Sequence, residues 1–141
     1  MILFCDTSAL VKLYIAEDAS REMRALADAA TVVAVSRIAW AEMMAAVARR
    51  ARESPGDAQT METVRKRLSA DWPHYAVVEL TQAIVELAGD YADTFALRAC
   101  DSVQLAAARS LQELAGEEVQ FACFHTRLCK AARTLGMASF P

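Results

Sequence analysis

The chain has 141 residues, of which 55% are hydrophobic and 23% are charged, and its formal net charge is −3. This composition excludes a disordered polymer and is typical of a globular domain with a substantial core. The net charge excludes a globally basic nucleic-acid binder, although clustered arginines can still hold a phosphate backbone locally. Charges interrupt every apolar run before it reaches the roughly 18 residues of a membrane span. We therefore expect no membrane-spanning helix.

The N-terminal segment lacks the pattern of a signal peptide, because Asp6 and Lys12 interrupt the stretch that would have to be continuously apolar. We therefore expect a cytoplasmic protein. Four cysteines occur without C-x-x-C spacing, at Cys5, Cys100, Cys123 and Cys129. In a reducing compartment, such residues are expected to be reduced and to behave as small apolar core residues, rather than as zinc ligands or redox partners.

Strand and helix patterns alternate along the whole chain. In chain order, the predicted elements are strand 2–5, helix 9–14, helix 21–30, strand 31–35, helix 36–52, helix 58–70, strand 75–80, helix 81–94, helix 102–114, strand 119–124, helix 126–135 and an edge strand 137–140. Ser20, Asp57 and Thr81 are positioned as N-caps of the helices that follow them. The segment Ser54-Pro-Gly-Asp57 is the clearest break between helices. The alternation predicts a single α/β domain over 1–141, with a mainly parallel sheet of four to five strands.

Asp6 is the first residue after the predicted strand 2–5. In parallel α/β sheets, ligands bind at the carboxyl ends of the strands, where loops and helix N-termini converge. A carboxylate at this place can hold a metal ion, or it can cap the helix that follows. Asp6 alone does not decide between these two roles.

Glu42 does not fit its surroundings. Its neighbours three and four positions away on a helix are all apolar, namely Ile38, Ala39, Ala45 and Ala46. A buried and unpaired carboxylate costs several kcal/mol. Glu42 should therefore be protonated, bound to a metal ion, or paired with an arginine from another element.

Asp101 also has two interpretations. The segment Asp101-Ser-Val-Gln104 fits a capping box, with Asp101 as N-cap and Gln104 as its reciprocal partner. The helix that it opens is nearly all apolar, so its N-terminus should lie deep in the fold, where its N–H groups could also bind a phosphate. Asp6, Glu42 and Asp101 could then converge on one edge of the sheet. Clustered carboxylates repel one another unless a cation neutralises them, and an all-oxygen set favours Mg²⁺ or Mn²⁺ over zinc.

Four blocks of the sequence together resemble PIN-domain ribonucleases, and most closely the VapC toxins of bacterial toxin–antitoxin pairs. The blocks occur in the order of that family, at Phe4-Cys-Asp-Thr-Ser-Ala-Leu-Val-Lys-Leu-Tyr14, Ser36-Arg-Ile-Ala-Trp-Ala-Glu42, Leu97-Arg-Ala-Cys-Asp-Ser-Val-Gln-Leu-Ala-Ala-Ala108 and Arg127-Leu-Cys-Lys-Ala-Ala-Arg-Thr-Leu-Gly136. The resemblance covers essentially the whole chain.

The resemblance implies a PIN-like α/β/α sandwich in which Asp6, Glu42 and Asp101 form a catalytic site for Mg²⁺ or Mn²⁺. It implies hydrolysis of RNA phosphodiester bonds, with the metal activating the attacking water. It also implies a homodimer and a cognate VapB-like antitoxin that inserts an arginine among the acids. Ser8 matches a hydroxyl position near the first acid, which binds metal-held water or phosphate. A local turn at the helix start is the alternative role for Ser8.

The sequence departs from the family at His125. The family often carries a fourth acid after the last buried strand, in a Thr-x-Asp-like block, and here Cys123 replaces the hydroxyl residue and His125 the acid. A histidine can be a further metal ligand or orient water, but it brings no negative charge. Three interpretations follow: an active enzyme with altered metal preference, a one-metal enzyme, or a weakened one. We expect activity to be retained, because the three core acids are present.

RNA binding requires cations near the acids. Arg98 precedes Asp101 by three residues and Arg127 follows His125 by two, so we expect both arginines to bind substrate at the rim of the site. Two other classes of protein are alternatives. A phosphatase of the haloacid dehalogenase type needs a second Asp two positions after the first, where this chain has Ser8. A PIN-like binding module with its site weakened at His125 is the non-enzymatic alternative.

Overall fold

The computed structural model describes residues 1–141 and contains one five-stranded sheet in which all neighbouring strands are parallel. Across the sheet the strands follow the order β3-β2-β1-β4-β5. Their bounds are Ile2–Cys5 (β1), Val32–Ser36 (β2), Ala76–Val78 (β3), Val119–Ala122 (β4) and Ala138–Phe140 (β5). The predicted α/β fold with a parallel sheet is confirmed, and the fifth strand lies at the edge as expected.

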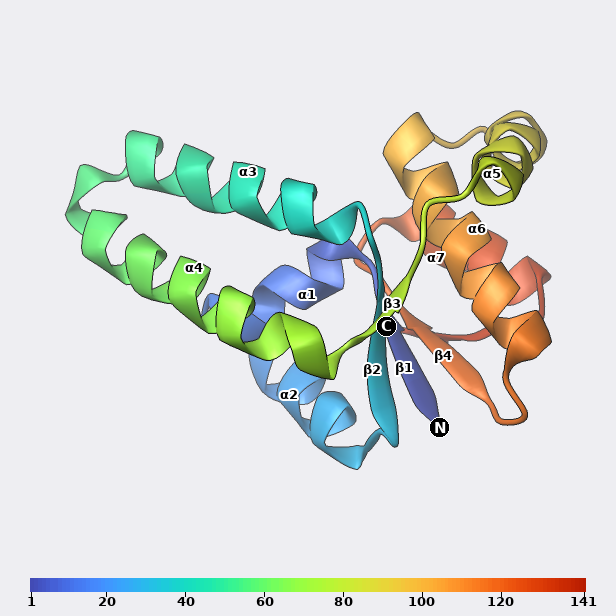
Figure 1. Cartoon of the computed structure of the whole chain (residues 1–141), viewed down its shortest axis with the longest axis horizontal. Helices are drawn as coiled ribbons and strands as arrows, with labels where there is room; N and C mark the ends of the chain where they lie inside the picture. Colours follow the sequence, from blue (N-terminus) through green and yellow to red (C-terminus); the bar gives the residue numbers. More distant parts are fainter.

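Helices cover both faces of the sheet, which gives the expected α/β/α layers. Figure 1 shows α1 to α4 on one side of the strands and α5 to α7 on the other. The helix bounds are Thr7–Tyr14 (α1), Ser20–Ala29 (α2), Ala39–Glu53 (α3), Ala58–Asp71 (α4), Gln82–Phe95 (α5), Ala99–Leu114 (α6) and Thr126–Thr134 (α7), with short 3-10 turns at Pro55–Asp57 (η1) and Trp72–His74 (η2). None of these helices combines the length and the apolar character needed to cross a membrane.

β1 lies at the centre of the molecule and contributes to both cores. All four of its residues are buried. Because successive side chains of a strand point to opposite faces, Leu3 and Cys5 pack with α1 to α4, whereas Ile2 and Phe4 pack with α6 and α7. Burial on both faces explains why β1 is a continuous apolar run rather than an alternating one.

The hairpin of α3 and α4 extends away from the sheet, with the predicted break at its tip (Figure 1). The two helices bury Val47 of α3 against Met61 and Val64 of α4. Asp57 occupies the N-cap position of α4, as predicted, but its side chain makes no capping hydrogen bond. Its Oδ2 instead accepts a hydrogen bond from Nε of Arg50 at 3.1 Å, because the 3-10 turn brings the end of α3 back beside Asp57.

Two further caps test the sequence predictions. Thr81 caps α5 as predicted, since its hydroxyl accepts a hydrogen bond from the N–H of Ile84 at 3.2 Å. Ser20 does not cap α2, because it is already the first helical residue and Ala19 is the N-cap, with φ of 65°. The Ser20 hydroxyl instead donates to the carbonyl of Ile15 at 3.2 Å and stabilises the preceding turn.

The strand order brings distant parts of the chain to one edge of the sheet. Cys5 pairs with Ala122, so the residues after β1 and after β4 leave the sheet side by side. β2 lies on the other side of β1 and leads into α3. The carboxyl ends of these three strands therefore bring Asp6, His125 and the start of α3 to the same edge of the molecule.

Candidate active site

Asp6 is both a helix cap and a buried acid. Its Oδ1 accepts hydrogen bonds from the N–H of Ala9 at 2.9 Å and from the hydroxyl of Ser8 at 2.6 Å. The side chain is the N-cap of α1, and the residue is only 2% exposed. Its other oxygen, Oδ2, has no protein donor. The capping role and the ligand role are therefore compatible, because each would use a different oxygen.

Ser8 connects Asp6 to the turn that follows β4. Its hydroxyl donates to Asp6 and accepts a hydrogen bond from the N–H of Phe124 at 2.8 Å. Ser8 lines the cavity next to the acids, but its only proton is used by Asp6. The hydroxyl therefore holds β1 and the His125 turn in fixed relation to each other.

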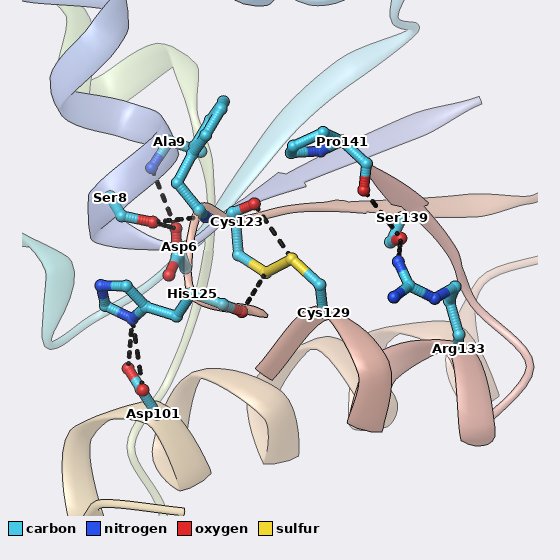
Figure 2. The surroundings of a disulfide bond; sticks show 11 residues. Asp6, Ser8, Ala9, Asp101, Cys123, His125, Cys129, Arg133, Ser139 and Pro141 are labelled. Atoms are coloured by element: carbon cyan, nitrogen blue, oxygen red, sulfur yellow. Dashed lines mark hydrogen bonds and ion pairs between the residues drawn. A yellow bond between two sulfur atoms is a disulfide. The ribbon is translucent and has the colours of Figure 1, made fainter. Parts of the chain in front are cut away.

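Asp101 and His125 face each other across the site. Nδ1 of His125 lies 3.1 Å from Oδ1 and 3.2 Å from Oδ2 of Asp101, and Figure 2 shows the imidazole ring pointing toward this carboxylate. Asp101 is not the predicted N-cap of a capping box. It lies in the first turn of α6, and the N-cap is Arg98. Because α6 begins three residues earlier than predicted, the Asp101 side chain is free to face His125.

Asp6, Asp101 and His125 together form a group that could hold a metal ion. One potential ligand atom from each residue lies within 4.8 Å of the others. Glu42 does not belong to this compact group, but it lines a cavity of about 650 Å³ together with Asp101 and His125. The structure thus gathers two of the three predicted acids with His125, and places the third acid on the wall of the same cavity.

Glu42 is half-buried in the first turn of α3 and carries no ion pair. Its Oε1 accepts hydrogen bonds from the hydroxyl of Thr7 at 3.1 Å and from Nε2 of Gln104 at 2.9 Å. Neither Thr7 nor Gln104 was predicted as a site residue. The signal for Gln104 was the same as for Glu42, namely a polar side chain on an otherwise apolar helix segment, but the capping-box interpretation had already given Gln104 a role.

Burial raises the pKa of Asp6 to about 6. The hydrogen bonds from Ser8 and Ala9 and the nearby imidazole of His125 lower this pKa, and the negative charge of Asp101 raises it. No Lys or Arg forms an ion pair with Asp6, Glu42 or Asp101. The three carboxylates therefore form an acidic site whose charge is not neutralised by an ion pair with a Lys or Arg of the chain.

Comparison with known proteins places the chain in a family. The sequence model of the PIN domain matches residues 3–115, a span that includes Asp6, Glu42 and Asp101. The chain belongs to the PIN-domain family. It is 34% identical over 107 residues to ribonuclease VapC45 of Mycobacterium tuberculosis, a match that covers 76% of this chain and 74% of that protein.

Solved structures show the same fold at lower identity. A toxin–antitoxin complex from Klebsiella pneumoniae contains a chain with a TM-score of 0.64 and 20% identity, covering 89% of this chain and 88% of that one. VapBC2 from Rickettsia felis, bound to a DNA fragment from its promoter, gives a TM-score of 0.66 at 15% identity, with full coverage of both chains. The predicted resemblance to VapC-like PIN domains is thus confirmed.

The two arginines predicted to bind substrate, Arg98 and Arg127, lie in different settings. Arg98 lines the 650 Å³ cavity and also a neighbouring one of about 680 Å³, which continues past Thr7 to Arg49 and Arg50 of α3. Arg127 lines neither cavity, and its Nη1 donates to the carbonyl of Ala96 at 2.9 Å. Arg98 therefore lies in the same cavity as Glu42, Asp101 and His125, whereas Arg127 ties the start of α7 to the turn between α5 and α6.

The cysteines depart from the expectation that all four are reduced core residues. A disulfide joins Cys123 and Cys129, on either side of His125, with their Cα atoms 6.1 Å apart (Figure 2). The two residues come together because α7 turns back directly after β4. Cys5 is a free buried thiol as expected, but Cys100 is free and exposed beside Asp101. The charges of Glu42 and Asp101 add to partial burial in raising the pKa of Cys100.

Proposed function

We propose that the chain is a divalent-metal-dependent endoribonuclease and the toxin of a toxin–antitoxin pair. The observation that carries the proposal is the group of Asp6, Asp101 and His125, with ligand atoms within 4.8 Å of one another, in a cavity that Glu42 also lines. Membership of the PIN-domain family and the similarity to ribonuclease VapC45 support RNA as the substrate.

The donor set fits a hard divalent cation. Asp6 Oδ2, Glu42 Oε2 and the Asp101 carboxylate provide oxygens that form no ion pair with a Lys or Arg, and His125 Nε2 has no hydrogen-bond partner. Carboxylate oxygens favour Mg²⁺ or Mn²⁺, and we propose that Asp6, Glu42 and Asp101 hold this ion, with His125 as a further ligand. When bound, the ion supplies Lewis-acid activation of water and neutralises charge on the scissile phosphate.

The chain's own residues prepare the site before any substrate arrives. Ser8 and the N–H of Ala9 fix Asp6, while Asp101 fixes the ring of His125. The acids lie at the carboxyl edge of the sheet, and Arg98 lines both cavities. An RNA backbone bound at this edge would thus have a cation close to the acids. Such fixed positioning is what in-line attack on a phosphodiester requires.

Arg98 and Arg127 give a matched test of substrate binding. We expect Arg98→Ala to raise the KM for RNA about tenfold, because the loss of one phosphate contact weakens binding electrostatically. We expect Arg127→Ala to leave the KM unchanged and to lower the free energy of unfolding by about 1 kcal/mol, through the lost bond to Ala96. Steady-state cleavage of a labelled RNA and denaturant unfolding measure the two effects. Equal KM values for Arg98→Ala and the parent protein would remove Arg98 from the substrate-binding set.

The proposed partner is an antitoxin. The structural neighbours include a toxin–antitoxin complex and VapBC2, which share the fold of this chain. The acids of the site would attract an arginine of such a partner, because no arginine of this chain neutralises them. We further propose that the chain forms a homodimer and acts in the cytoplasm.

Induced expression in a bacterial host tests the toxin proposal. We expect the unchanged chain to arrest growth and to create new RNA 5′ ends, and Asp101→Asn to do neither, while reaching the same level of soluble protein. Sequencing of RNA 5′ ends after induction also identifies the cleaved RNA. Equal growth arrest by both proteins would separate toxicity from the acid site and contradict the proposal.

A further inference from the structure

Gln104 is the most deeply buried polar group that contacts the candidate site. It is 1% exposed and lies one helical turn after Asp101 on α6. Its Nε2 donates to Oε1 of Glu42 at 2.9 Å and to the hydroxyl of Thr7 at 3.1 Å. This one amide therefore joins α6, which covers one face of the sheet, to α1 and α3, which cover the other.

The hydrogen-bond chemistry fixes the direction of this amide. An ionised carboxylate only accepts hydrogen bonds, so the amino group of Gln104 has to face Glu42. The hydroxyl of Thr7 accepts from Gln104 and donates its own proton to the same Oε1 of Glu42. Gln104 thus donates to Glu42 directly and also to Thr7, which in turn donates to Glu42. Both routes end at the same oxygen, Oε1 of Glu42.

The arrangement leaves one buried atom unpaired. Oε1 of Gln104 is buried and has no hydrogen-bond partner, the one buried side-chain polar atom of which this is true. An unpaired buried carbonyl destabilises a fold, so a residue selected for packing alone would be better replaced by an apolar side chain of the same shape. The unpaired oxygen of the Gln104 amide thus lowers the stability of the fold, while the amino group of the same amide donates a hydrogen bond to Glu42.

We infer that Gln104 is a positioning residue for the proposed metal site. With Thr7 it saturates Oε1 of Glu42, which prevents the carboxylate from rotating and leaves Oε2 for the cation. The inference rests on the proposed function, since it assigns Glu42 a metal ion. Residues that orient metal ligands through hydrogen bonds typically change metal affinity by about 10–100-fold when they are replaced.

Gln104→Met separates positioning from packing, because methionine has a similar length and shape but no donor and no unpaired carbonyl. We expect this variant to bind Mn²⁺ about tenfold more weakly by titration calorimetry, while its metal-free melting temperature stays the same or rises. A merely structural role would give the reverse, with a lower melting temperature and unchanged affinity for Mn²⁺. Gln112→Met is the matched control on the same helix, since Gln112 bonds only Arg109. It should leave Mn²⁺ affinity unchanged.

A double-mutant cycle tests whether Gln104 acts through Glu42. In a Glu42→Gln background, Gln104→Met should cause no further loss of Mn²⁺ affinity, because the group that it positions has been changed. A further tenfold loss in that background overturns the inference. If Gln104→Met does not fold, Thr7→Val removes the other donor to Oε1, and we expect a loss of Mn²⁺ affinity of about threefold; unchanged affinity overturns the inference.

The outcomes distinguish failure of the inference from failure of the proposed function. If the parent chain binds Mn²⁺ and Gln104→Met binds it equally well, Gln104 has no positioning role and the proposed function stands. If the parent chain binds no Mn²⁺ at all, both are overturned.

Discussion

Asp6→Asn should abolish RNA cleavage and, in the absence of metal, make the protein more stable at neutral pH. Asn keeps the oxygen that caps α1, because its carbonyl can accept the same hydrogen bonds from Ser8 and Ala9. It removes the charge of the acid. We expect the rate of RNA cleavage to fall at least about a thousandfold, since the proposed ion loses its most buried ligand.

The stability gain follows from the pKa of Asp6, which burial raises to about 6 from its ordinary value of 3.8. The folded state therefore binds the proton more tightly than the unfolded state. The contribution of Asp6 to the free energy of unfolding is fully present below about pH 4 and is lost as the pH rises through about 6. Above pH 6, ionised Asp6 costs the metal-free protein up to about 3 kcal/mol, and Asn does not titrate.

Urea unfolding in chelator measures this effect. The difference in the free energy of unfolding between Asp6→Asn and the parent protein should be largest at pH 7.5 and should shrink toward pH 4. Asp28→Asn, which changes an exposed acid of α2, controls for the loss of one negative charge and should show no such difference. A destabilised Asp6→Asn protein at pH 7.5 would mean that a partner for the charge of Asp6 exists within the chain.

His125→Asp should tighten metal binding by at least tenfold. The substitution restores an acid where His125 now lies beside Asp101, within 4.8 Å of the other candidate ligands. Two unit charges 4 Å apart interact by about 4 kcal/mol at an effective dielectric constant of 20. Tenfold corresponds to only about 1.4 kcal/mol, which allows for solvent screening of this half-exposed side chain. In the metal-free protein, the added repulsion should lower the melting temperature.

Melting curves with and without Mn²⁺ check both effects in one experiment. The rise in melting temperature on adding Mn²⁺ should be larger for His125→Asp than for the parent chain. His74→Asp is the matched control, because His74 is exposed and distant from the acids, and it should show no gain. A parent chain without any Mn²⁺ response, together with a strong response of His125→Asp, would favour a binding module whose metal site was weakened at His125.

The layer arrangement and the sheet could be predicted because they depend on local patterns. The apolar run of β1, the β-branched run of β2 and the break at Ser54-Pro-Gly-Asp57 each indicate their structure within a few residues. Thr81 was predicted as a cap for the same reason. Ser20 and Asp57 were also predicted as caps, but neither side chain caps its helix. The start of α2 differs from the prediction by one residue, which makes Ser20 the first helical residue, and the Asp57 side chain bonds Arg50 instead.

The internal connections of the site could not be predicted in the same way, because they depend on long-range contacts. Asp101 looked like a cap, and only the earlier start of α6 shows that it faces His125. Gln104 contacts Thr7, 97 residues away in sequence, and no local pattern indicates such a contact. Arg127, which was predicted to bind substrate, donates to the carbonyl of Ala96, and no local pattern indicates this contact either.

Cleavage of a labelled single-stranded RNA by the purified chain tests the central claim most directly. We predict no cleavage in chelator, cleavage after Mn²⁺ or Mg²⁺ is restored, and no cleavage by Asp6→Asn at any metal concentration. Cleavage that persists in chelator, or that Asp6→Asn retains at the parent rate, would contradict a metal-dependent nuclease site at Asp6, Glu42 and Asp101.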